Sequence, residues 1–380
     1  MKSILQKDLW SITSFLENKN YKFNKENILT QLPEKFIDEA IKAISSWDNY
    51  APTPLVKLNK LNDELKFKNI YYKDEDKRFD LKSFKALGGA FAVYKIASEK
   101  ENITVSTATA GNHGRSVAWG AQRLGLKCKI FISEFVSESR AEAMRKLDAE
   151  VIRVKGNYDN SLKECIKQSK ENNWEIVQDV SWEGYKEVPK LIMAGYTIMV
   201  KEILDELKSN SITHVFLQAG VGGMAAAMIA GFAKLSKNIP KFITVEPENA
   251  DCVFQSIKNN KPTTVDIKKE TIMGGMSCGD VSSIAWEILK NSTNYCLTVP
   301  DEAISTTVAL LAEKHLSDEK IIAGECAVPG IIALIGSFNN KEYLDKLELN
   351  EQSNVLLFGC EGLTDSAMYQ KLLSDGLQKI

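Results

Sequence analysis

Residues 214–232 read HVFLQAGVGGMAAAMIAGF and contain the repeating unit of the predicted fold. HVFLQ is typical of a strand and MAAAMIAGF of a helix, and Gly220, Gly222 and Gly223 lie in the short turn between them. Glycines allow a close approach of the backbone, and a helix N-terminus presents N–H groups and the positive end of its dipole. The stretch therefore predicts a phosphate-binding turn from Gly220 through Val221 to Met224.

Similar strand-like runs alternate with helical segments from about residue 69 onward. Such alternation predicts an α/β fold, because each crossover between parallel strands needs a helix that packs back on the sheet. We find no linker or repeat, so a second lobe has to form by the chain crossing over and returning. The other predicted strands are NIYYK (69–73), NITVS (102–106), KCKIFI (127–132), EVIRV (150–154), WEIV (174–177), KFITVE (241–246) and SNVLLF (353–358).

Length and composition narrow the class of protein. A chain of 380 residues predicts two lobes. The 48 basic and 50 acidic residues nearly cancel, which argues against a nucleic-acid partner. No apolar run is long enough to span a bilayer, and residues 1–20 are predicted to form an amphipathic helix rather than a signal peptide, so we expect a soluble, cytoplasmic protein without a membrane partner.

The cysteines and histidines predict no metal site. Seven cysteines form no Cys-x-x-Cys pair, and three histidines lie far apart in the sequence. We expect most of these cysteines to be free, buried thiols. Cys252 and Cys278 could approach each other around one loop, but a cytoplasmic setting favours their reduced form.

Three further loops carry reactive side chains. Lys85 lies between Phe84 and a predicted Gly-Gly turn ahead of an apolar helix, where partly apolar surroundings and the helix dipole favour the neutral amine that forms Schiff bases. Taken alone, a solvated lysine is the commoner interpretation. TATAGNHG (107–114) predicts a second anion site at a helix N-terminus. Asp179 follows the strand WEIV, where burial would raise its pKa toward that of a proton acceptor, although a turn-forming aspartate is equally consistent.

Two motifs offer rival functions. Gly220 to Ala225 fits the dinucleotide fingerprint G-x-G-x-x-A, with Glu246 about 20 residues later as a ribose-binding acid, which would make the chain an NAD-binding oxidoreductase. Residues 275–279, GMSCG, match the hydrolase elbow G-x-S-x-G with Ser277 as nucleophile, but no hydrophobic strand precedes them.

Taken together, the motifs resemble the fold-type II pyridoxal-phosphate enzymes, which include tryptophan synthase β and the serine and threonine dehydratases. Ser-Phe-Lys at 83–85, Ala-Gly-Asn-His at 110–113 and the later glycine loop carry this resemblance in order. Within that group the chain is most similar to the 2,3-diaminopropionate ammonia-lyases, through KDEDKRFDLKSFKALGG, GNHGRSVAWGAQ, VQDVSWEGY, TIMGGMSCGD, AGECAVPG and CEGLTD between residues 73 and 366.

The resemblance implies two lobes, each with a mostly parallel sheet flanked by helices. A large cofactor-binding domain would comprise residues 1–87 and 195–380, and a smaller substrate-side domain residues 88–194. It also implies a homodimer that acts on a small amino acid. The implied cofactor, pyridoxal 5′-phosphate, would be bound by Lys85, Asn112, Gly220, Val221, Gly222, Gly223, Met224 and Cys360.

The resemblance assigns the remaining roles as well. Lys85 would form a Schiff base with the cofactor, and Asp179 would take the α-proton of the L-substrate. Asn112 would meet the ring hydroxyl, and the Cys360 thiol would lie near the ring nitrogen and leave it unprotonated, although a buried Cys360 with no role fits as well. The substrate carboxylate would bind at Thr107, Thr109, Ala110, Gly111 and Asn112.

The implied reaction is the α,β-elimination of L-2,3-diaminopropionate to pyruvate and two ammonia molecules, a step of amino-acid degradation. One departure matters: these lyases carry an aspartate for the D-isomer where this chain has Ala110. We therefore expect poor activity on the D-isomer. Because Ala-Gly-Asn-His is also similar to the threonine dehydratases, a serine or threonine dehydratase remains an alternative, as does a cofactor-binding protein without catalysis.

Overall fold

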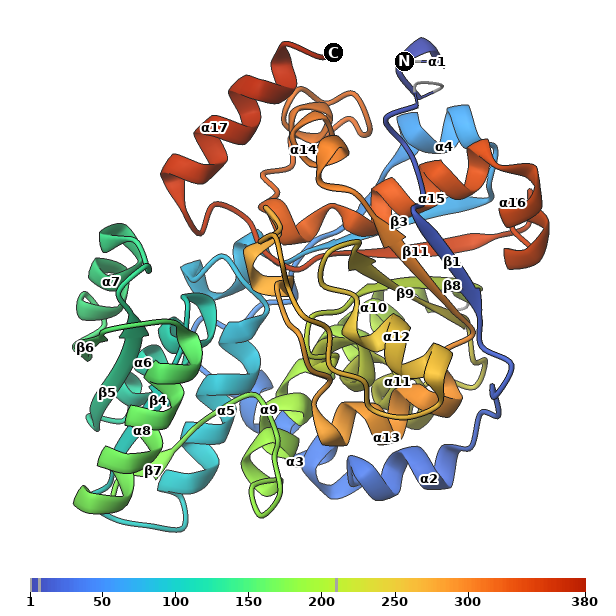
Figure 1. Ribbon diagram of the computed structural model, residues 1–380. Coiled ribbons are helices and arrows are strands. Elements are labelled where there is room, and N and C mark those ends of the chain that lie inside the picture. Colours follow the sequence, from blue (N-terminus) through green and yellow to red (C-terminus); the bar gives the residue numbers. More distant parts are fainter. Residues whose placement is uncertain (1, 6–7, 209–210) are drawn as a thin grey trace. The chain divides into compact units, whose positions relative to one another are not determined.

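The computed structural model describes residues 2–5, 8–208 and 211–380, and the chain is divided into two compact units (Figure 1). The larger unit comprises Met1–Gln31, Pro52–Lys77 and Met199–Ile380, and the smaller one Leu32–Ala51 and Arg78–Ile198. The domain division expected from the sequence differs from these units, because it assigns residues 32–51, 78–87 and 195–198 to the larger domain. Lys85 belongs to the smaller unit.

A seven-stranded sheet forms the centre of the larger unit. Its strands follow the order β1-β10-β9-β8-β11-β3-β2, and only the two edge strands β1 and β2 run antiparallel to their neighbours. The inner strands β8, β10 and β11 are buried along their whole length, as parallel strands covered on both faces are. The strand bounds are β1 (Ser14–Glu17), β2 (Leu55–Lys57), β3 (Asn69–Asp74), β8 (His214–Gln218), β9 (Lys241–Pro247), β10 (Tyr295–Val299) and β11 (Asn354–Gly359).

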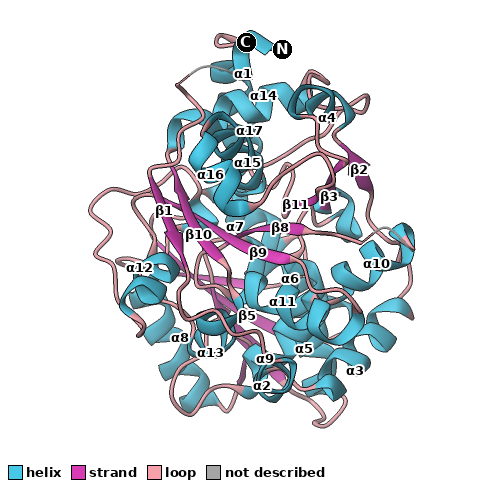
Figure 2. Ribbon diagram, turned by 90° about the vertical axis from the view of Figure 1, so that its right-hand side faces the viewer, coloured by secondary structure: helices cyan, strands magenta, loops and turns pink. Residues whose placement is uncertain are grey.

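Helices cover both faces of this sheet. Figures 1 and 2 show α15 (Pro329–Asn339) and α16 (Lys341–Leu347) on one face, and α11 (Gly223–Leu235), α12 (Cys252–Asn259) and α13 (Ser283–Ser292) on the other. The remaining helices of this unit are α1 (Lys2–Leu5), α2 (Lys25–Gln31), α4 (Asn59–Leu65), α10 (Ile198–Leu207), α14 (Ile304–Ala312) and α17 (Ser366–Leu377), with 3₁₀ turns η2 (Gly274–Met276), η3 (Asp301–Ala303) and η4 (Glu325–Ala327).

The smaller unit is built on a four-stranded, wholly parallel sheet in the order β6-β5-β4-β7. Helix α8 (Tyr158–Asn172) packs on one face, where Ala108, Phe131 and Cys165 form a buried cluster. On the other face lies α6 (Asn112–Arg123), which in turn packs against α5 (Lys85–Ala97). The other elements are α3 (Glu34–Ser45), β4 (Thr104–Ala108), β5 (Lys127–Ser133), α7 (Glu138–Arg145), β6 (Glu150–Val154), β7 (Glu175–Ile176) and α9 (Glu187–Tyr196), and η1 (Glu75–Asp80) leads into this unit.

The predicted α/β fold is confirmed, and all eight predicted strands are present. The amphipathic helix predicted over residues 1–20 is wrong for the described part of that stretch, where the short α1 is followed by β1. Strand β1 pairs antiparallel with β10 in the register Ser14 to Thr298, so pairing with the sheet edge overrides the helical pattern. Among the described residues, no helix is long and apolar enough to cross a membrane.

Candidate active site

Helix α5 begins at Lys85, whose backbone N–H donates to Ser83 Oγ over 3.3 Å. The predicted Gly-Gly turn is wrong, since Gly88 and Gly89 lie inside this helix. A Cβ at Gly88 would lie 2.4 Å from Tyr196 Cε1, and one at Gly89 would lie 2.4 Å from Ser116 Oγ. The glycines therefore allow α5 to approach α9 and α6 closely, and this packing fixes the helix end that carries Lys85.

The Lys85 ammonium lies in a partly buried, aromatic environment. Its Nζ is 2.5 Å from Asp179 Oδ2, and the two side chains are 25% and 14% exposed. The same nitrogen lies 5.5 Å from the centroid of the Phe84 ring and 5.9 Å from that of Tyr196. The structure thus brings together the two side chains predicted to be catalytic, a cation and a carboxylate joined by a charge-assisted hydrogen bond.

The pKa of Asp179 differs from the expectation. Burial acts to raise the pKa of this carboxyl. The charged form of His113, the charge of Lys85 and the hydrogen bond from Lys85 act to lower it, and the pKa lies well below its usual range. The prediction that burial would raise this pKa is therefore wrong for the paired state, because it did not include the neighbouring lysine. Asp179 is a carboxylate at neutral pH and can accept a proton.

His113 is a candidate residue that the sequence interpretation missed, since it was noted as part of the Ala-Gly-Asn-His motif but was given no role of its own. Its Nδ1 lies 3.7 Å from Asp179 Oδ2, and its Nε2 is 2.8 Å from the carbonyl oxygen of Val177. Burial, and to a lesser extent the charge of Lys85, lower the pKa of His113 although Asp179 acts to raise it. The signal available in the sequence was its place in the Gly-Asn-His turn, one residue into a helix.

The residues predicted to bind the substrate carboxylate fall into two groups in the structure. Thr109 Oγ1 accepts hydrogen bonds from the backbone of Gly111 at 3.0 Å and Gly114 at 3.1 Å, so Thr109 caps α6. Thr107 is fully buried and donates to Gln178 Oε1 over 2.8 Å. Ala110, by contrast, is exposed, and Gly111 and Asn112 are partly exposed at the start of α6, where helical N–H groups lack acceptors within the helix.

In the larger unit, the glycine loop connects β8 to α11. Gly222 has a φ of 87°, a left-handed conformation that favours glycine, and directly precedes the helix. A Cβ built at Gly223 meets no described atom within 4 Å, so there is room beside the backbone. The first N–H groups of α11 point out of the helix at this loop, which is the arrangement that binds a phosphate.

Cys360 follows β11 in the same unit, and Gln218 links this strand to the end of β8. Gln218 Nε2 donates to the carbonyl oxygens of Phe358 at 2.5 Å and Cys326 at 3.1 Å. The Cys360 thiol is buried and donates to the same Cys326 oxygen over 3.2 Å. Cys360 and the glycine loop are thereby attached to one framework at the carboxyl ends of neighbouring parallel strands, where open α/β sheets bind ligands.

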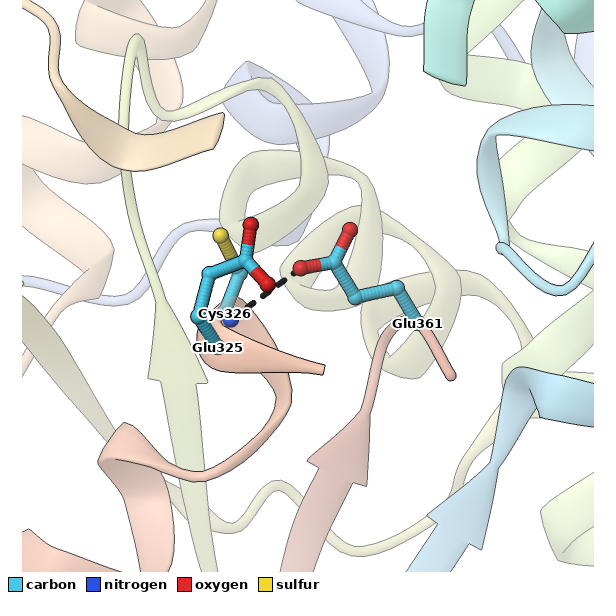
Figure 3. A group of neighbouring side chains, drawn as sticks. All are labelled: Glu325, Cys326 and Glu361. Atoms are coloured by element: carbon cyan, nitrogen blue, oxygen red, sulfur yellow. Dashed lines mark hydrogen bonds between the residues drawn. The ribbon is translucent and has the colours of Figure 1, made fainter. Parts of the chain in front are cut away.

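A buried acidic group lies beside Cys360. Figure 3 shows the carboxylates of Glu325 and Glu361 turned toward each other next to Cys326, whose backbone N–H donates to Glu361 Oε1 over 3.1 Å. It is the one group of metal-ligand type found among the described residues. Burial, followed by the two carboxylates, raises the pKa of the Cys326 thiol, whereas metals bind the thiolate. We assign no metal to this group.

The rival motifs do not form the sites that their functions need. Glu246 is buried and accepts hydrogen bonds from the backbone N–H groups of Val253 at 2.8 Å and Phe254 at 2.7 Å, so it caps α12 and is not turned toward a ribose. Ser277 follows the 3₁₀ turn η2 rather than a strand, and its hydroxyl donates to Glu270. Cys252 and Cys278 form no disulfide with each other.

Each unit thus supplies part of what a phosphorylated aldehyde cofactor requires. The smaller unit presents a lysine amine in aromatic surroundings with a carboxylate beside it. The larger unit presents a glycine-lined helix N-terminus and a buried thiol, which is a weak donor and not an acid. These donor sets fit pyridoxal 5′-phosphate.

Comparison with known proteins identifies the family to which the chain belongs. Residues 47–361 match the family model "Pyridoxal-phosphate dependent enzyme". The chain belongs to this family, and its cofactor is pyridoxal 5′-phosphate.

Individual relatives narrow the class further. Diaminopropionate ammonia-lyase of Escherichia coli strain K12 is 34% identical over 352 residues, which cover 86% of this chain and 88% of that protein. The crystal structure of the Escherichia coli enzyme with D-serine has a TM-score of 0.89 at 30% identity and covers 97% of this chain and 99% of that chain. Its selenomethionine holo form has the same TM-score and identity and covers 97% of this chain and 98% of that chain. The chain is a pyridoxal-phosphate-dependent lyase of the diaminopropionate ammonia-lyase and threonine dehydratase group.

Proposed function

We propose that the chain eliminates ammonia from L-2,3-diaminopropionate. One water molecule is consumed, and pyruvate and two ammonia molecules are released, one from the β-carbon and one from the α-carbon. The observation that carries the proposal is the contact of 2.5 Å between Lys85 Nζ and Asp179 Oδ2, because it joins a Schiff-base lysine to a carboxylate of low pKa. Such a pair suits abstraction of the α-proton.

The cofactor supplies an electron sink that stabilises negative charge on the α-carbon. Lys85 holds it covalently, and residues 220–224 bind its phosphate through backbone N–H groups. The Cys360 thiol, a weak donor, leaves the ring nitrogen without a proton. Such a ring favours elimination, in which the departing β-group removes the charge, over transamination.

Asp179 acts as the base in this scheme. Its carboxylate accepts the α-proton of the L-substrate, while residues 110–112 bind the substrate carboxylate at the N-terminus of α6. Where Lys85 carries no ammonium charge, its ion pair with Asp179 weakens. Burial then raises the pKa of Asp179 and makes it a stronger base.

A serine or threonine dehydratase is the second candidate, and Ala110 is the observation that favours it. In the diaminopropionate lyases that the sequence resembles, an aspartate holds this position and serves the D-isomer. The two candidates share Lys85 and differ in the leaving group, which is ammonia in one and water in the other.

Product stoichiometry decides between them. The purified holoenzyme is given L-diaminopropionate, L-serine or L-threonine, and oxo acid and ammonia are measured together. We expect two ammonia molecules per pyruvate from diaminopropionate, with a kcat/KM at least about tenfold above that for the hydroxy amino acids. Faster turnover of serine or threonine, with one ammonia molecule per oxo acid, would reject the first candidate.

A further inference from the structure

The buried imidazole of His113 makes one hydrogen bond with the described residues, to the carbonyl oxygen of Val177. It is 5% exposed, and its Nδ1 has no hydrogen-bond partner among the described residues. A buried polar atom left without a partner is destabilising, and native structures contain few of them. Such an atom beside reactive side chains calls for a functional explanation.

The other ring nitrogen fixes the tautomer. Val177 O lies 2.8 Å from Nε2 and can only accept, so Nε2 carries the hydrogen. In the neutral ring Nδ1 therefore carries a lone pair, 3.7 Å from Asp179 Oδ2. Burial keeps the ring neutral, because it lowers the pKa of His113. A lone pair and an ionised carboxylate cannot hydrogen-bond to each other, which explains the open contact.

The contact becomes favourable when Asp179 gains a proton. The carboxyl O–H can then donate to Nδ1 and satisfy both atoms. We propose that His113 is a positioning residue that stabilises the protonated form of Asp179 and orients its carboxyl group during proton abstraction. This inference rests on the proposed role of Asp179 as the base.

The proton balance is simple. The C–H bond at the α-carbon breaks, its electron pair stays with the substrate, and an O–H bond forms on Asp179. His113 Nδ1 accepts a hydrogen bond from that O–H until the product leaves and the proton returns to water. Lys85 and Asp179 are the ionisable groups that act on His113 from the neighbouring elements. Burial and, to a lesser extent, the charge of Asp179 raise the pKa of Tyr185 and of Tyr196, so both side chains are neutral phenols.

Two substitutions separate this role from a structural one. His113→Gln keeps an N–H donor for Val177 O and removes the acceptor near Asp179. His113→Asn keeps an acceptor near the Nδ1 position and removes the donor. A purely structural role predicts that glutamine rescues the enzyme better, whereas the proposal predicts that asparagine does.

The experiment compares kcat, KM and the primary isotope effect with α-deuterated substrate across the pH range for the holoenzyme and both variants. We expect His113→Gln to lower kcat at least about tenfold, with a larger isotope effect and little change in KM. We expect His113→Asn to lower kcat less than His113→Gln does. Equal loss in both variants, or a glutamine variant with the wild-type isotope effect, would overturn the proposal.

NMR of the imidazole nitrogens gives a readout that needs neither turnover nor a correct substrate. The chain has only three histidines, so assignment by substitution is straightforward. We expect His113 to be the neutral Nε2–H tautomer at neutral pH, and to protonate at lower pH in Asp179→Asn than in the wild type. A charged His113 at neutral pH, or the Nδ1–H tautomer, would overturn the proposal. If diaminopropionate is not turned over at all, the proposed function fails, and this measurement still tests His113.

Discussion

Two lysines on helix α5 have the same exposure and opposite surroundings. The side chains of Lys85 and Lys95 are each 25% exposed, but Lys85 faces the partly buried Asp179 and Lys95 faces Glu39 at the surface. We expect Lys85→Ala to lower kcat on the order of 10³-fold or more, and to remove the visible absorbance that borohydride abolishes. Lys95→Ala should keep both properties, since an exposed ion pair contributes little.

Both variants are assayed per unit of folded protein, because Asp179 also loses its partner in Lys85→Ala. The assignment fails if Lys85→Ala retains the absorbance and turnover.

A single substitution at Ala110 can test the predicted preference for L- over D-diaminopropionate. Its side chain is exposed before α6, so a carboxylate can be introduced there without burial. We expect wild-type protein to turn over D-diaminopropionate at least about 100-fold more slowly than the L-isomer, because alanine accepts no proton. Ala110→Asp should raise the D-rate and leave the L-rate within a few-fold. Similar wild-type rates on both isomers would contradict this prediction.

At the scale of elements, the close packing of α5 against α9 depends on Gly88. A Cβ there would lie 2.5 Å from the backbone oxygen of Ile192 as well as against Tyr196, so neither helix can accommodate it by a side-chain rotation alone. We expect Gly88→Ala to destabilise the protein by about 1–3 kcal/mol, measured by denaturant unfolding. Gly274→Ala is the matched control, because a Cβ there meets no described atom within 4 Å. Equal stability of the two variants would contradict the packing argument.

The strands could be predicted because each is a short β-branched or aromatic run followed by a helix. The strands that were missed have weaker local signals: β1 and β2 are short antiparallel edge strands, and YCLTV of β10 lies among apolar helices. Gly88 and Gly89 were placed in a turn because local sequence does not reveal which helices pack against them. The pairing of Lys85 with Asp179 joins residues 94 positions apart and likewise depends on tertiary structure. The loops that contain both residues were still identified from the sequence.

At the scale of the whole molecule, stability should depend on a buried histidine far from the reactive side chains in sequence. His214 in β8 donates from Nε2 to Leu347 O over 2.8 Å, and its Nδ1 lies 2.8 Å from Thr213 Oγ1. Burial lowers the pKa of His214 to about 4. The unfolded chain, with a histidine pKa of about 6.5, binds more protons than the folded one between these values, so stability falls as the pH drops through this window.

We expect the protonation of His214 to decrease the free energy of unfolding by about 2 kcal/mol as the pH falls from about 7 to about 5. His214→Gln keeps a donor for Leu347 O but does not titrate, and should lose that part of the pH dependence. His315→Gln, at an exposed position, should behave as wild type. An unchanged pH dependence in His214→Gln would contradict the account.

Covalent attachment of the cofactor tests the central claim most directly. The purified holoenzyme is reduced with borohydride and digested, and the peptides are analysed by mass spectrometry. The account predicts the mass of reduced pyridoxal phosphate on the peptide that contains Ser83-Phe84-Lys85, located on the Lys85 side chain. Attachment to a different lysine, or no adduct on a protein that shows the visible absorbance, would contradict it.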